Sequence, residues 1–163
     1  LGAATPRAAR ADGPAPPRSQ DSVPGASLVV SVVTFGQGEQ VWERFGHNAI
    51  WVQDRATGMS TMWHWGLFDF QQPNFVGRFL TGDTRYWMEG FDGEAMLQHY
   101  REYDRGITVQ QLAMTPAQRL ALLDFLRWNE QEANKFYRYD YYRDNCSTRL
   151  RDALDRALGG LLA

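Results

Sequence analysis

The chain has 163 residues, a length typical of one domain, and its 44% hydrophobic content is enough for a real core. Its 17 basic and 19 acidic residues give a formal net charge of −2, so the composition shows no electrostatic signature of nucleic-acid binding. A single cysteine excludes an intramolecular disulfide framework and any zinc site built on cysteines. The longest apolar run, 28–35, is strand-length and far below the roughly 20 residues of a membrane span.

Residues 1–26 are rich in alanine, proline and arginine and show no apolar periodicity, which predicts a disordered leader. The rest, 27–163, is predicted to fold as one domain. The chain begins at Leu1 rather than methionine. Removal of an exported protein's signal peptide would account for that start.

The folded part is predicted to alternate short strands and helices. A β-branched run at 28–35 predicts a buried strand, and 48–53 and 61–65 predict a hairpin with its turn at 54–58. Further predicted elements are strands at 84–91 and 107–114, an extended aromatic segment at 136–142, and helices at 39–45, 73–80, 94–103, about 115–134 and 146–158. This order predicts an α+β fold, an antiparallel sheet with packed helices.

The only cysteine, Cys146, falls in the first turn of the last predicted helix, behind a capping residue, Asn145. The backbone N–H groups at a helix N-terminus carry partial positive charge, so they stabilise a thiolate and lower the thiol pKa. The same groups can bind the oxyanion that forms when a thiolate attacks a carbonyl. The alternative is a small buried hydrophobe. The helix position favours a nucleophile.

A thiol nucleophile needs a base directed at it. His99 lies in a polar helix and is predicted to be solvated. His47 and His64 lie on the two strands of the predicted hairpin, where side chains of neighbouring strands meet. The alternative for each is a core histidine packed among tryptophan rings.

Four sequence blocks occur in a fixed order: Phe45-Gly46-His47-Asn48-Ala49, Trp63–Phe70, Pro73-Asn74-Phe75 and Tyr137–Arg149. Over about residues 28–158 they resemble the N-terminal periplasmic domain of the Lnb-type bacterial lipoprotein N-acyltransferases. More broadly, histidine first and cysteine last resembles the circularly permuted papain-like (NlpC-type) thiol enzymes, which include relatives of lecithin:retinol acyltransferase and NlpC-type peptidases.

The resemblance implies that permuted papain-like fold, with Cys146 as nucleophile and His47 as its base. His64 matches the third polar position, where the resemblance leads us to expect Asn or Asp. It also suggests substrate-binding residues: an apolar wall and polar groups for a lipid head group. These residues are Trp63, Trp65, Phe68, Phe70, Phe75 and Phe79 in the wall, with Arg85, Asn145 and Arg149 as the polar groups.

Two other interpretations of these residues stay open. The aromatic cluster at 63–70 is also typical of core and hairpin packing, and Arg85, Arg143 and Arg149 are placed to pair with nearby aspartates, Asp83, Asp140 and Asp144. Neither a metal nor another cofactor is expected, because the three histidines and Asp69 lack metal-ligand spacing.

The sequence therefore predicts a thiol acyltransferase that takes an acyl chain from a phospholipid through a thioester and passes it to an amine such as a lipoprotein N-terminus. The alternatives are a papain-like hydrolase of cell-wall peptide amides and a catalytically inactive binding module. The expected partners are phospholipid and lipoprotein substrates at a membrane surface, with no nucleic acid. Lnb-type enzymes carry a membrane-embedded part after this domain. Two alternatives follow: a partner segment of that kind lies outside this chain, or the chain is a soluble relative with a different substrate. The expected location is the periplasm or the membrane-associated cell envelope.

Overall fold

The computed structural model describes residues 23–39, 46–69, 74, 78, 85–140 and 142–162. Most of the predicted leader lies outside the described residues. So do most of the predicted helix at 73–80, nearly all of that at 39–45, and three aromatics of the predicted substrate wall, Phe70, Phe75 and Phe79.

A single antiparallel sheet with strand order β5-β1-β2-β3-β4-β6 forms the centre of the described structure. β2 and β3 are the predicted hairpin, and its turn is fixed by the Asp54 carboxylate, which accepts hydrogen bonds from Ala56 N–H and the Thr57 hydroxyl. The strands are β1 (Leu28–Phe35), β2 (His47–Asp54), β3 (Met59–Leu67), β4 (Arg85–Asp92), β5 (Ile107–Gln111) and β6 (Phe136–Arg138).

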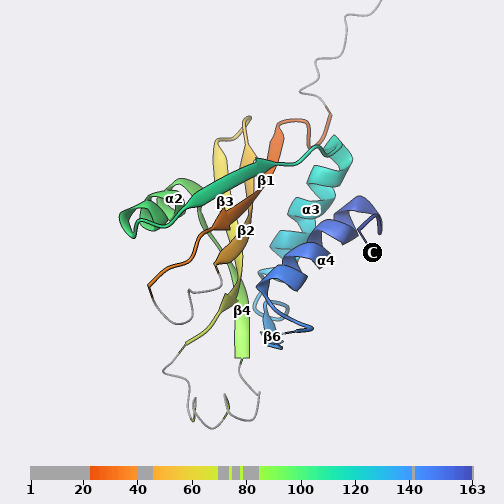
Figure 1. The fold of residues 1–163 in the computed structure, drawn as a ribbon. Helices are drawn as coiled ribbons and strands as arrows, with labels where there is room; N and C mark the ends of the chain where they lie inside the picture. The colour runs from red at the N-terminus through yellow and green to blue at the C-terminus, as the bar shows by residue number, and fades with distance from the viewer. Residues whose placement is uncertain are drawn as a thin grey trace, which may run out of the picture.

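Helices cover the two faces of the sheet unequally (Figure 1). α3 (Pro116–Asn129) and α4 (Cys146–Leu158) pack on one face, which we call the helix face, and α2 (Gly93–Glu102) lies on the other, the α2 face. Alternation along the strands sorts the core accordingly. In β2, Ile50 and Val52 join the core beneath α3 and α4, whereas Ala49 and Trp51 join a smaller core with Leu97 of α2.

The helix boundaries follow their caps. Thr115 and Gln118 form the predicted capping box of α3, and Asn145 caps α4, whose bounds match the prediction. α3 ends at Asn129, five residues earlier than predicted. There the Asn129 side chain donates to the Asn134 carbonyl, and the Asn134 side chain donates to the Trp128 carbonyl, so the chain turns back toward β6.

The predicted α+β class with an antiparallel sheet is confirmed. Whether this sheet belongs to the permuted papain-like type stays a prediction. Within the described ranges, none of the helices is both long and apolar enough to cross a bilayer.

Candidate functional site

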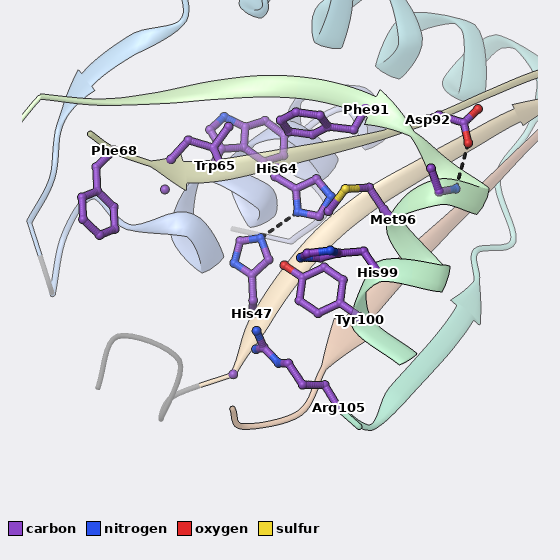
Figure 2. Close-up of a pocket in the computed structure, with 14 residues that line it drawn as sticks. His47, His64, Trp65, Phe68, Phe91, Asp92, Met96, His99, Tyr100 and Arg105 are labelled. Carbon is purple, nitrogen blue, oxygen red and sulfur yellow. Dashed lines mark hydrogen bonds between the residues drawn. The ribbon is translucent and has the colours of Figure 1, made fainter. Parts of the chain in front are cut away.

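Two histidines from adjacent strands meet on the α2 face. His47 is the first residue of β2, and His64 of β3 lies opposite Ala49, so both side chains project from the same face. His47 Nε2 and His64 Nδ1 are 2.9 Å apart, within hydrogen-bond distance (Figure 2). The rings are nearly parallel, with 5.1 Å between centroids. The neighbouring strands thus fix one imidazole against the other.

Burial keeps both imidazoles neutral. It lowers the pKa of His47 to about 4, with the charge of Arg105 as a second cause. It lowers the pKa of His64 to about 3, with His47 as a second cause. Figure 2 shows the Arg105 side chain directed at the His47 ring from the far side of the pair. Near neutral pH the pair therefore carries no charge, and each imidazole keeps one nitrogen with a lone pair.

Only one arrangement of protons lets His47 act as a base through its remaining nitrogen. If His47 Nε2–H donates to His64 Nδ1, then His47 Nδ1 holds a lone pair and His64 Nε2 carries a hydrogen. His64 Nε2 is buried without a hydrogen-bond partner among the described residues. The reverse arrangement would place a hydrogen on His47 Nδ1 and remove its basic lone pair. His64 can therefore position His47 by acting as acceptor.

The histidine pair borders a cavity of about 610 Å³ between the sheet and α2 (Figure 2). Sequence reasoning missed the α2 contribution. The signal was the i, i+3, i+4 spacing of Met96, His99 and Tyr100, which places the three on one side of a helix. The lining is mostly apolar and aromatic: Gly46, His47, His64, Trp65, Gly66, Leu67, Phe68, Phe91, Asp92, Ala95, Met96, His99, Tyr100 and Arg105.

The sole cysteine lies on the other face. Cys146 is the first residue of α4, and the start of that helix is fixed to β2 by a 3.2 Å hydrogen bond from Asn48 Nδ2 to Ser147 Oγ. Because successive strand residues point to opposite faces, Asn48 reaches α4 while His47 points into the cavity. Among the residues described, no hydrogen bond joins the thiol to His47, and Cys146 does not line the cavity. The catalytic dyad stays a prediction.

Gly66 lies next to both the cavity and the cysteine. It lies at an irregularity in the β3–β4 pairing, with a positive φ of 93°, and it lines the cavity. A Cβ at this position would lie 3.5 Å from Cys146 Cβ. A residue without a side chain therefore separates the histidine cavity from the cysteine, and the positive φ itself favours glycine.

Sequence reasoning also missed Tyr137 of β6. Its hydroxyl is buried without a hydrogen-bond partner in the part of the chain that the structure describes, and it lies 3.9 Å from the same Gly66 Cβ position. Burial raises the pKa of Tyr137, and the neighbouring Cys146 raises it further. The hydroxyl therefore stays protonated, as a donor beside the cysteine. Nothing in the sequence set this tyrosine apart from its aromatic neighbours.

The N-terminus of α4 is already capped. Asn145 Oδ1 accepts hydrogen bonds from Ser147 N–H and Thr148 N–H, so those two groups are used within the chain rather than offered to an oxyanion. Arg149 forms the predicted ion pair with Asp144, and its guanidinium carbon lies 4.5 Å from the centroid of the Tyr137 ring. Asn145 and Arg149, predicted to bind substrate, thus support the surroundings of Cys146.

The remaining predicted site residues are dispersed. The Trp63 and Trp65 indoles are buried on the helix face, where they donate to Glu130 and Asn129; Trp65 also borders the cavity. Phe68 lines the cavity, and Arg85 lies outside it, with its guanidinium carbon 3.5 Å from the Phe136 ring centroid. Within the described ranges, no three His, Cys, Asp or Glu side chains converge on a metal position.

Comparison with known proteins gives one match. The family model described as the Lnb N-terminal periplasmic domain matches residues 15–163, which is most of the chain. No curated protein and no solved structure matches.

Proposed function

Because the chain belongs to the Lnb N-terminal periplasmic domain family, we propose that it is a cysteine-dependent acyltransferase of the cell envelope, with a permuted papain-like topology. Cys146 takes an acyl group from a phospholipid, and an amine such as a lipoprotein N-terminus receives it. The expected setting is the periplasmic side of a membrane.

The observation that carries this proposal is the apolar cavity beside a neutral histidine pair, with Gly66 both lining that cavity and lying next to Cys146. An acyl chain needs an apolar enclosure next to the group that attacks its carbonyl. Phe68, Phe91 and Met96 supply such walls. Among the described residues that line the cavity, Asp92 supplies the one carboxylate, and that group accepts a hydrogen bond from Ala95 N–H at the start of α2.

In the proposed first half-reaction, His47 Nδ1 takes the thiol proton as sulfur attacks the ester carbonyl. The carbon–oxygen bond to the glycerol then breaks, and the departing alkoxide receives that proton, which leaves a thioester on Cys146. In the second half, the amine attacks the thioester, gives a proton to His47, and the carbon–sulfur bond breaks. The sulfur recovers the proton. Because His47 projects from the α2 face and Cys146 lies on the helix face, the scheme requires a rearrangement that brings the imidazole and the thiol together when substrate is bound.

The oxyanion of each tetrahedral intermediate needs a donor. Asn145 occupies two N–H groups of the first turn, and the Tyr137 hydroxyl is a buried side-chain donor near Cys146 without a partner among the described residues. We assign it to the oxyanion. A preorganised donor of this kind stabilises charge that develops only during reaction.

Intact mass measurement of the protein after incubation with phospholipid vesicles tests the proposal. We expect an acyl adduct on wild type, none on Cys146→Ala, and adduct formation slowed by about 10²–10⁴ in His47→Ala. Gln98→Ala is the matched control, because Gln98 is exposed on α2 and does not line the cavity. Cleavage of muropeptides without an acyl adduct would overturn the transferase in favour of the peptidase. If neither product forms, the catalytically inactive binding module is the alternative that remains.

A further inference from the structure

A hydrogen bond joins the two residues that follow the predicted base and the predicted nucleophile. Asn48 comes directly after His47 in β2, and Ser147 comes directly after Cys146 in α4. Asn48 Nδ2 donates to Ser147 Oγ over 3.2 Å, across 99 positions of sequence. This bond, which we call the Asn48–Ser147 clamp, links the strand that carries the histidine to the helix turn that carries the cysteine.

The clamp acts on the part of α4 that precedes its buried residues. Cys146 is only partly buried, and the fully buried residues of α4 come later: Leu150, Ala153, Leu154 and Ala157. The Asn145 cap and the ion pair of Asp144 with Arg149 join residues of one short segment, so they shape the turn without fixing its place on the sheet. The clamp reaches across to β2 and helps to fix that place.

Alternation along β2 directs His47 and Asn48 to opposite faces. His47 lines the cavity on the α2 face, whereas Asn48 reaches the start of α4 on the helix face, where α4 packs on β2 (Figure 1). One peptide unit separates the two residues, so the clamp also sets how far the start of α4 lies from the strand position that carries the imidazole.

We propose that Asn48 and Ser147 are positioning residues of the transferase. The clamp holds the start of α4 at β2, so that the thiol and the imidazole come together by a local movement of Cys146 rather than by displacement of the helix. Neither Asn48 nor Ser147 lines the cavity, so they act through His47 and Cys146 rather than on the acyl chain. That role rests on the proposed function, in which His47 and Cys146 react together.

Acyl-adduct formation on vesicles of ester lipids measures the positioning role. We expect Asn48→Ala and Ser147→Ala each to slow acylation of Cys146 by about ten- to a hundredfold at saturating lipid, with the half-saturating lipid concentration unchanged. Asn48→Ala/Ser147→Ala should be no slower than either single variant, because both changes remove the same bond. Ser147→Thr keeps the hydroxyl and should keep most of the rate. Gln98→Ala, which removes an exposed 3.0 Å hydrogen bond to Glu102, is the matched control.

A disulfide trap tests the clamp without any acyl transfer. His47→Cys places a second thiol at the position of the imidazole, and diamide oxidises two thiols that meet to a disulfide, taking up their two protons and two electrons. Because the two positions lie on opposite faces, trapping reports the rearrangement itself. We expect intact mass to show the loss of two hydrogens about tenfold more slowly in His47→Cys/Asn48→Ala than in His47→Cys. His47→Cys/Gln98→Ala should match His47→Cys.

The clamp and the transferase fail separately. Slower trapping in His47→Cys/Asn48→Ala, together with no acyl adduct on wild type, refutes the transferase and leaves the clamp as the link between β2 and α4. Equal trapping with and without Asn48 overturns the clamp, and so does an adduct that forms equally fast in Asn48→Ala and wild type. If Ser147→Thr is as slow as Ser147→Ala, the hydroxyl is not the contact that positions Cys146, and the clamp is again overturned.

Discussion

The two faces of the sheet differ in how they treat buried polar groups. On the helix face the tryptophan N–H groups are paired, Trp63 with Glu130 and Trp65 with Asn129, and among the described residues the Tyr137 hydroxyl, near Cys146, is the buried side-chain group there without a partner. On the α2 face a cavity remains, and beside it two imidazoles are held neutral, with one nitrogen, His64 Nε2, unpartnered within the described part of the chain. Unpaired buried polar groups cost stability and often mark function. The helix face is built for stability, and the α2 face leaves room for a ligand.

Replacing one apolar side chain on each face gives the largest expected contrast. Leu126→Ala removes a fully buried side chain of α3 and should lower the free energy of unfolding by about 2–5 kcal/mol. Met96→Ala enlarges a cavity that already exists and should cost less than about half as much. Urea unfolding of both variants measures the difference. Equal costs would mean that the α2 face is packed as tightly as the helix face.

Sequence patterns predicted the helix face better than the α2 face. The N-terminal caps of α3 and α4 depend on a few adjacent residues, so Thr115 and Asn145 predicted where these helices begin. The β2–β3 hairpin was equally local, and it placed His47 and His64 on neighbouring strands. The cavity depends on how α2 packs against the sheet. Because α2 is far from the hairpin in sequence, no local pattern predicts the space left between them.

The surroundings of Cys146 show the same limit. Its place at the start of a helix was readable from Asn145, but the sequence did not reveal that Asn145 would take up the N–H groups offered to an oxyanion. Nor did it reveal that Tyr137, nine residues before Cys146, would place near the cysteine a buried hydroxyl that has no partner among the described residues. Both outcomes follow from the packing of β6 and α4 near Gly66.

Acid should destabilise the protein through the α2 face. Because folding lowers the pKa of both histidines below the ordinary value of 6.5, the folded state binds fewer protons than the unfolded state. Stability is therefore complete above pH 6.5 and is lost as pH falls toward 4, by about 1.4 kcal/mol per pH unit for His64 alone.

Denaturant unfolding across that pH range, on wild type, His64→Gln and His99→Gln, measures this slope. His64→Gln removes one titrating group and should flatten the dependence. His99→Gln alters an exposed histidine and should follow wild type. If the free energy of unfolding falls with pH equally in wild type and His64→Gln, groups other than His64 cause the acid sensitivity.

Tyr137→Phe should affect stability and activity in opposite directions, which is the smallest but sharpest expected effect. The hydroxyl is buried and has no partner among the residues that the structure describes, so its removal should raise the free energy of unfolding by about 1 kcal/mol, since an unmade buried hydrogen bond costs about that much. If the hydroxyl stabilises the oxyanion, the same change should slow acyl-adduct formation on Cys146 by about a hundredfold.

Tyr103→Phe, which alters an exposed tyrosine, is the matched control and should change neither quantity. A stabilised variant with unchanged adduct formation would show that Tyr137 only packs beside the cysteine. A destabilised one would show that its hydroxyl has a partner in solution, most simply a bound water between it and the thiol.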